Sequence, residues 1–199
     1  MTVAAVLPVA CASVPPSEQT QRVRAPLYEQ RFARLSAVLD WSLEGRLAIS
    51  DEADGGSGQL RWRQQEGGTR MDFHGALGRG AWRLEADSAG AELQLADGSL
   101  SRADSVDALV RAEIGWRVPV ESLAWWIRGL AAPGPLEHRL LDEQGRLSEL
   151  AQDGWRIEFD RYGDFSSVSM PVRLTARQDD RTVKLAIRKW QLSAPDETP

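Results

Sequence analysis

Residues 41–49 read Trp41-Ser-Leu-Glu-Gly-Arg-Leu-Ala-Ile49, with apolar side chains recurring at alternate positions. Successive side chains of an extended chain point to opposite faces, so this stretch predicts a β-strand with one apolar and one polar face. The pattern returns between turn sequences such as Asp54-Gly55-Gly56, Gly67-Gly68 and Asp97-Gly98. Short alternating strands joined by tight turns predict an antiparallel sheet.

Helical spacing interrupts the alternation between residues 103 and 130. Apolar side chains at positions 106, 109, 110 and 114 recur with the helical period, and a second short helix is predicted from Pro119 to Leu130. A further helix is predicted over residues 27–39. The chain therefore contains two or three helices among ten or eleven strands.

The last predicted strand changes the face on which its apolar residues lie. Val183, Leu185 and Ile187 stand at odd-numbered positions, whereas Trp190 and Leu192 stand at even-numbered positions and so would point to the opposite face. This change predicts either a β-bulge near Arg188 or a strand with apolar neighbours on both faces.

A sheet of this length twists and curls instead of remaining flat. The predicted fold class is therefore mainly β, an incomplete antiparallel β-barrel of about eleven strands curled around an apolar cavity, with helices as a lid. The lid would carry Leu123, Trp126 and Ile127. The alternative for each cavity position, taken singly, is ordinary core packing. The cavity is predicted to be lined by Trp62, Met71, Phe73, Trp82, Leu84, Leu93, Leu95, Ile157, Phe159, Val172 and Leu174.

The N-terminus carries the single cysteine of the chain at the end of its longest apolar run. Residues 2–10 are too few to span a bilayer but suit the apolar region of a signal peptide. With the small Ala10 before it, Cys11 resembles the lipidated cysteine of a bacterial lipobox; the alternative is an apolar N-terminus with an incidental cysteine. The predicted organisation is a signal segment at 1–11, a flexible tether at 12–26, a folded domain at 27–192 and a disordered tail at 193–199.

Composition and charge argue against several classes of function. The 199 residues carry a formal charge of −5, and an acidic chain without a basic cluster does not favour nucleic acid. Arg61-Trp62-Arg63 mixes basic and aromatic residues, but alternation places the Trp on the opposite face from both Arg. One cysteine cannot supply a disulfide or a zinc site by itself, and no metal site is expected.

A series of short segments resembles the LolB family of outer-membrane lipoproteins. The series includes Leu60-x-Trp62 and Gln152-Asp-Gly-Trp155, and it covers about residues 27–192. The remaining segments are Trp41-x-Leu-x-Gly-Arg-Leu-Ala, Gly75-Ala-Leu77-Gly78, Pro119-Val-Glu-Ser-Leu-x-x-Trp126-Ile-Arg-Gly129, Tyr162, Met170-Pro171 and Lys184-Leu-x-Ile-x-x-Trp190.

The resemblance implies a function as well as a fold. A member of this family accepts lipoproteins from the periplasmic carrier LolA and releases them into the inner leaflet of the outer membrane, without a cofactor. It implies a lipid anchor on Cys11, no nucleic-acid partner, and a membrane-insertion loop at Gly75, Leu77 and Gly78. A buried turn residue is the alternative for Leu77. The chain is expected to be a monomer.

Two other classes remain as alternatives. An enzyme is disfavoured because no nucleophile elbow, phosphate loop or metal spacing is present, and His74 and His138 stand singly at polar positions. A lipid-binding or envelope-stress sensor lipoprotein with a similar open barrel would bind ligand without passing it on.

Overall fold

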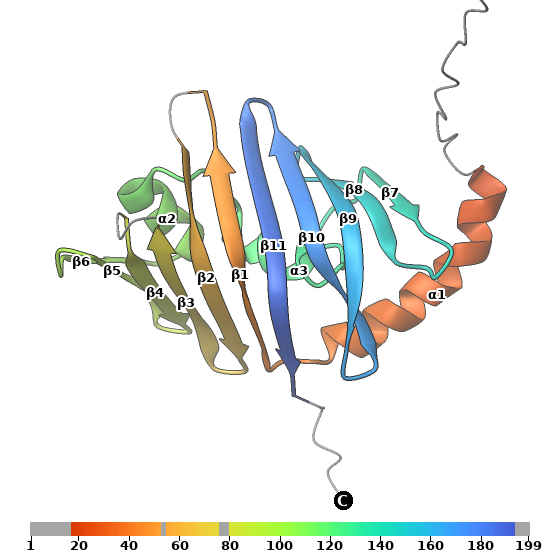
Figure 1. The fold of residues 1–199 in the computed structure, drawn as a ribbon, viewed down its shortest axis with the longest axis horizontal. Coiled ribbons are helices and arrows are strands. Elements are labelled where there is room, and N and C mark those ends of the chain that lie inside the picture. Colours follow the sequence, from red (N-terminus) through yellow and green to blue (C-terminus); the bar gives the residue numbers. More distant parts are fainter. Residues whose placement is uncertain (1–16, 53–54, 76–79, 194–199) are drawn as a thin grey trace, which may run out of the picture.

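The computed structural model describes residues 17–52, 55–75 and 80–193, which form one antiparallel sheet and three helices (Figure 1). The strand order is β6-β5-β4-β3-β2-β1-β11-β10-β9-β8-β7, and β6 and β7 stand at the two free edges. The predicted open barrel of about eleven strands is therefore confirmed. The elements are α1 (Glu18–Ser36), β1 (Trp41–Ser50), β2 (Gly55–Gln65), β3 (Gly68–Gly75), β4 (Trp82–Asp87), β5 (Gly90–Leu95), β6 (Leu100–Ala103), α2 (Val106–Ile114), α3 (Val120–Trp126), β7 (His138–Leu141), β8 (Leu147–Gln152), β9 (Trp155–Phe165), β10 (Val168–Gln178) and β11 (Arg181–Leu192).

The sheet consists of two meanders that meet where β1 pairs with β11. This pairing runs from Trp41 opposite Leu192 to Ser50 opposite Thr182. Helices α2 and α3 connect the two meanders and lie behind the sheet in Figure 1. We call the face of the sheet that these helices cover the inner face, and the opposite one the outer face. The buried apolar positions of the strands lie on the inner face, where they form the core.

Two hairpins turn through residues in the left-handed region. Asp153 (φ 54°) and Gly154 (φ 73°) connect β8 to β9, as the Asp-Gly pair in the sequence indicates. Ser166 (φ 47°) and Ser167 (φ 66°) make the corresponding turn between β9 and β10 without a glycine. A Ser-Ser pair is a weak turn signal, so only the strand pairing identifies this hairpin.

A β-bulge at Arg188 explains the change of face in the last strand. Glu44 pairs with Lys189, whereas the next residue, Gly45, pairs with Ile187. Arg188 is thus the extra residue, and both Ile187 and Trp190 reach the core. Gly45 is required opposite the bulge because a Cβ there would lie 2.5 Å from the Ala186 carbonyl oxygen. The first of the two predicted explanations is confirmed.

The prediction of a flexible tether is wrong over residues 18–26, which belong to α1. Ser17 caps this helix, its side chain accepting a hydrogen bond from the Thr20 amide at 3.3 Å. Pro26 lies inside the helix, where it costs about 3 kcal/mol because it lacks an amide donor and crowds the preceding turn. Polar composition and proline therefore gave the wrong local prediction.

Tertiary contacts hold α1 against the β7 edge of the sheet. Gln21 accepts from the Leu141 amide at 2.8 Å, and Arg24 donates to the Leu141 carbonyl at 2.8 Å. Tyr28 and Leu35 are 1% exposed and belong to the core. Burial of this helix face offsets the cost of the internal proline.

Several predicted features fall at least partly outside the described residues. The signal segment at 1–11 with Cys11, residues 12–16 of the predicted tether, Leu77 and Gly78 lie outside them. Of the predicted tail only Ser193 is described, and its amide donates to the Asp40 carbonyl at 3.0 Å.

Candidate functional site

Most of the side chains predicted to line a cavity gather on the inner face of the sheet. Nine of the eleven belong to one buried apolar core, Leu95 packs half-buried against it, and Val172 is buried outside it. Leu84, Leu93 and Leu174 are fully buried. These side chains fill the inner face in the described structure, where they contact one another and the helices above them.

The predicted lid residues are more deeply buried than is expected of a helix that rests loosely on the sheet. Trp126 and Ile127 are 0% exposed and Leu123 is 3% exposed. The Trp126 Nε1 donates to the Gln152 side-chain oxygen at 3.0 Å, and this oxygen also accepts from the Ala132 amide at 2.9 Å. Gln152 thereby satisfies the one polar atom of Trp126 inside the core.

A buried arginine ties the end of α3 to the end of α1. The Arg128 guanidinium donates to the carbonyls of Ala124 at 3.0 Å and Leu35 at 3.2 Å. It lies 4.7 Å above the Trp125 ring and 5.7 Å from the Trp41 ring. Burial lowers the pKa of Arg128 to about 10. Carbonyl oxygens and aromatic faces, instead of a carboxylate, thus accommodate this buried cation.

Two apolar hollows lie where the helices leave the inner face uncovered. One, of about 700 Å³, has Trp41 and Trp62 on the sheet side and Ala124 and Trp125 of α3 in its lining, together with polar side chains such as Glu66 and Glu121. The other, of about 670 Å³, lies at the ends of β3 and β4. Its lining includes Gly75, Gly80, Phe73, Trp82, Leu95, Ile114 and Trp116.

Three aromatic rings form the floor of the second hollow. Phe73 and Trp82 stack with ring centroids 5.3 Å apart, and Trp116 meets both edge-on at 5.4 and 5.7 Å. The residues on either side of the predicted insertion loop, Gly75 and Gly80, line the same hollow. The described residues on both sides of the predicted insertion loop therefore border an apolar space.

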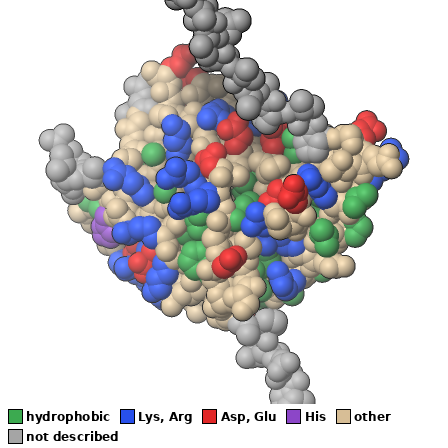
Figure 2. Space-filling view, turned by 45° about the vertical axis from the view of Figure 1, so that its right-hand side comes forward, with side chains coloured by type: hydrophobic (Ala, Val, Ile, Leu, Met, Phe, Trp, Pro, Cys, Tyr) green, Lys and Arg blue, Asp and Glu red, His purple; other side chains and the backbone are tan. Residues whose placement is uncertain are grey.

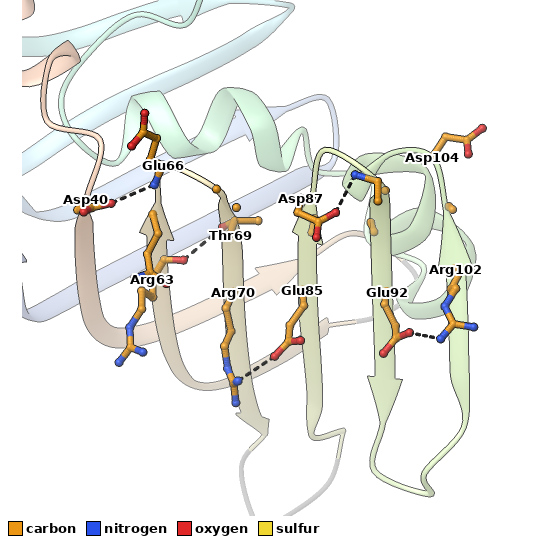
Figure 3. A pocket seen from close by; sticks show the side chains of 18 residues that line it. Asp40, Arg63, Glu66, Thr69, Arg70, Glu85, Asp87, Glu92, Arg102 and Asp104 are labelled. Atoms are coloured by element: carbon orange, nitrogen blue, oxygen red, sulfur yellow. Dashed lines mark hydrogen bonds and ion pairs between the residues drawn. The ribbon is translucent and has the colours of Figure 1, made fainter.

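A third hollow, of about 1040 Å³, has charged walls instead of apolar ones (Figure 3). Its walls are charged and paired: Arg70 binds Glu85 at 2.8 Å, and Arg102 forms an ion pair with Glu92. Asp40 accepts from the Glu66 amide at 3.0 Å. Acyl chains would not displace these interactions favourably, so the two apolar hollows are the better candidates for binding lipid.

The Arg61-Trp62-Arg63 segment does not form one surface. Trp62 is 1% exposed while Arg61 and Arg63 lie on the outer face, which confirms that they form no shared basic and aromatic surface.

The two histidines, His74 and His138, are both exposed. Within residues 17–52, 55–75 and 80–193, no group of three acidic, His or Cys side chains could hold a metal, and no helix is long and apolar enough to cross a membrane.

Several residues of the site were not predicted from the sequence. Arg128 and Gln152 lie within the LolB-like segments, but the sequence predicted no role for either, and Trp116 follows a predicted helix without a periodic position. Each also has a partner distant in the chain, Leu35 for Arg128, Ala132 for Gln152 and Phe73 for Trp116, and only the folded structure assigns these contacts.

Comparison with known proteins agrees with this architecture. The family model "Outer membrane lipoprotein LolB" matches residues 39–190. The chain is 38% identical over 164 residues to an outer-membrane lipoprotein LolB of Pseudomonas aeruginosa, covering 82% of this chain and 78% of that one. A LolB of Stutzerimonas stutzeri is 32% identical over 188 residues, covering 94% and 91%.

A solved structure supports the fold alone. A LolA superfamily protein of Nitrosomonas europaea superposes with a TM-score of 0.51 at 8% sequence identity, covering 83% of this chain and 93% of that one. The sequence identities to the LolB proteins are much higher than this value, and those matches extend over most of the chain. This protein therefore belongs to the LolB family, the non-enzymatic outer-membrane lipoproteins that receive lipoproteins from LolA and place them in the outer membrane.

Proposed function

We propose that the acyl chains of an incoming lipoprotein bind between the inner face of the sheet and the lid helices α2 and α3. The observation that carries this proposal is the continuous apolar inner face, which two short helices cover and two apolar hollows border. In the described structure the core side chains occupy this space. Cargo would therefore enter by moving the lid and replacing protein contacts with acyl contacts.

Transfer energetics require such a shielded site. Each buried CH₂ is worth about 0.8 kcal/mol, so one long acyl chain in water costs more than about 10 kcal/mol. Passage from one apolar site to another avoids this cost. Aromatic and Met side chains suit a site that repacks around varied chains, and Trp62, Met71 and Trp82 supply both kinds here.

Photo-crosslinking tests this location directly. A lipoprotein with a diazirine on its acyl chain, loaded from LolA, is expected to label inner-face residues such as Leu84, Leu93 and Trp62. Labelled peptides are identified by mass spectrometry. Labelling confined to the outer-face residues Arg63 and Lys184 would contradict the proposal.

The anchor is proposed to be a lipid on Cys11. The LolB family consists of outer-membrane lipoproteins, and Cys11 is the single cysteine of the sequence, within a lipobox-like segment. Mass spectrometry of the native protein is expected to find a diacyl or triacyl group on this residue. A free Cys11 thiol in the mature protein would contradict the assignment.

Delivery is proposed to depend on Leu77, in the segment that joins β3 to β4. The apolar hollow at Gly75 and Gly80 would connect this segment to the acyl-chain site. An apolar side chain that enters the bilayer at this point offers the cargo a route from the protein into lipid. We further propose that the protein acts as a monomer, since one sheet with its own lid can enclose an acyl chain.

A further inference from the structure

A set of cations covers the outer face of the four central strands, on the opposite side of the sheet from the lid. Figure 2 shows Lys and Arg side chains gathered over this face. We call this set the basic stripe. It consists of Arg61 and Arg63 on β2, Arg46 on β1, Lys184, Arg188 and Lys189 on β11, and Arg173 and Arg177 on β10, all of them exposed.

The charge of the stripe is opposite in sign to that of the protein as a whole. It holds eight of the 24 Lys and Arg residues, whereas Glu44 is the one carboxylate among the outward side chains of these strands. The formal charge of the stripe is therefore about +7, although the whole chain carries −5. Such segregation concentrates a positive potential on one face.

Ion pairing distinguishes the stripe from the rest of the outer face. On the neighbouring strands, Asp72 binds both Arg83 at 2.7 Å and Arg70 at 3.1 Å, and Glu85 binds Arg70 as well. Within the stripe, Arg61 pairs with Glu44 and Arg177 pairs with Glu158. Among the described residues, the other six cations have no carboxylate within ion-pair distance: Arg46, Arg63, Arg173, Lys184, Arg188 and Lys189.

The composition of the stripe favours a lipid surface over a protein partner. Stable protein interfaces have an apolar or aromatic centre from which charged residues are depleted. The exposed large apolar side chains of the described structure are Val23, Leu27, Leu39, Leu100 and Leu136, and none lies on β1, β2, β10 or β11. A broad cationic face without an apolar anchor instead suits the phosphate-rich, anionic surface of a bilayer.

We propose that the basic stripe binds anionic phospholipid headgroups and holds the outer face of the sheet against the membrane. A member of the LolB family is an outer-membrane lipoprotein, so phospholipid headgroups lie close to it. With the outer face on the bilayer, the lid helices face away from it and stay accessible to the carrier. The inference goes beyond the proposed acyl-chain site, because headgroup binding needs neither cargo nor lid movement.

Vesicle flotation tests the stripe without cargo. The full chain with Cys11→Ala, which removes any acyl anchor, is mixed with neutral phosphatidylcholine vesicles or with vesicles containing about 30% phosphatidylglycerol. We expect at least about tenfold stronger binding to the anionic vesicles, and loss of most of this difference at about 500 mM NaCl. Equal binding to both vesicles would overturn the proposal.

Two matched variants separate the stripe from net charge. The stripe variant carries Arg63→Gln, Arg173→Gln, Lys184→Gln and Lys189→Gln, whereas the control carries Arg22→Gln, Arg34→Gln, Arg111→Gln and Arg117→Gln. Both remove four exposed cations. We expect the stripe variant to bind anionic vesicles at least about tenfold more weakly, and the control to resemble the parent chain.

Other outcomes have defined meanings. An equal loss of binding to anionic vesicles in both variants would show that net charge, and not the stripe, determines binding, and would overturn the proposal. Normal vesicle binding by the stripe variant, together with weaker binding to LolA, would assign the stripe to an acidic protein partner instead. If the parent chain prefers anionic vesicles as expected but inner-face residues are not labelled by the acyl chain, the proposed acyl-chain site is contradicted and the proposed role of the stripe is unaffected.

Discussion

A covalent link between α3 and the β8–β9 turn is expected to reduce lipoprotein uptake from LolA more than about tenfold. Ser122 of α3 lies with its hydroxyl 3.3 Å from the Asp153 carboxylate, at an accessible position. Cysteines at both sites, in a chain carrying Cys11→Ala, can be joined by a short thiol crosslinker. If cargo enters by movement of the lid, the link blocks the entrance while the core stays intact.

Uptake is measured by transfer of a labelled lipoprotein from loaded LolA, before and after crosslinking. A reducible crosslinker allows recovery to be tested on the same sample. The matched control joins Glu85→Cys to Glu92→Cys, which face each other across β4 and β5 away from the lid. Undiminished uptake by the α3-linked protein would show that the lid need not move.

The crosslink is a sharper test than removal of a lid side chain. Trp126 is fully buried and bonded to Gln152, so Trp126→Ser is a large-to-small change in the core. Such changes cost about 3–5 kcal/mol. Loss of cargo binding in that variant could reflect unfolding, whereas a crosslink constrains the lid without creating a cavity.

Replacement of Leu77 by Glu is expected to slow delivery into liposomes by about tenfold or more, with uptake from LolA unchanged. A Leu side chain partitions favourably into a bilayer, whereas an acidic side chain costs up to about 3 kcal/mol near its centre and less at the interface. The segment between Gly75 and Gly80 would therefore lose its ability to enter lipid.

Delivery is followed by flotation of a labelled lipoprotein with liposomes after transfer. Leu77→Met is the matched control, since it preserves apolar character, and should deliver at a rate close to that of Leu77. Thermal unfolding of the two variants should match. Equal delivery by the Glu and Met variants would remove Leu77 from the proposed insertion step.

These experiments also separate a receptor from a mere lipid-binding protein. A chain that only binds ligand would be labelled by the acyl chain and yet release nothing to liposomes. LolB family membership indicates transfer, and the Leu77 experiment measures the transfer step apart from binding.

Much of the fold could be predicted because its signals are local. Alternation in β1, β2 and β9 depends only on neighbouring residues, and so does the parity change that locates the bulge at Arg188. The N-terminal part of α1 was missed for the converse reason. Its sequence is polar and contains Pro26, and its helix is stabilised by contacts with Leu141 far along the chain.

The candidate site could be predicted only in outline. Alternation identified which side chains face inward, and nine of the predicted lining residues do meet in one core. It could not show that the lid fills the inner face, since that depends on how α2 and α3 pack. The roles of Arg128 and Gln152 were not predicted because their contacts with Leu35 and Ala132 join residues that are not neighbours on a strand or helix turn.

By itself, the sequence determined that this chain forms an open antiparallel sheet with an apolar inner face and belongs with the LolB family, because period-two alternation and ordered motifs are properties of adjacent residues. Only the tertiary structure decided that the inner face is filled and that cations from β2, β1, β11 and β10 form one basic stripe. The pairing of β1 with β11 brings together residues from opposite ends of the chain, and no local pattern specifies such a contact.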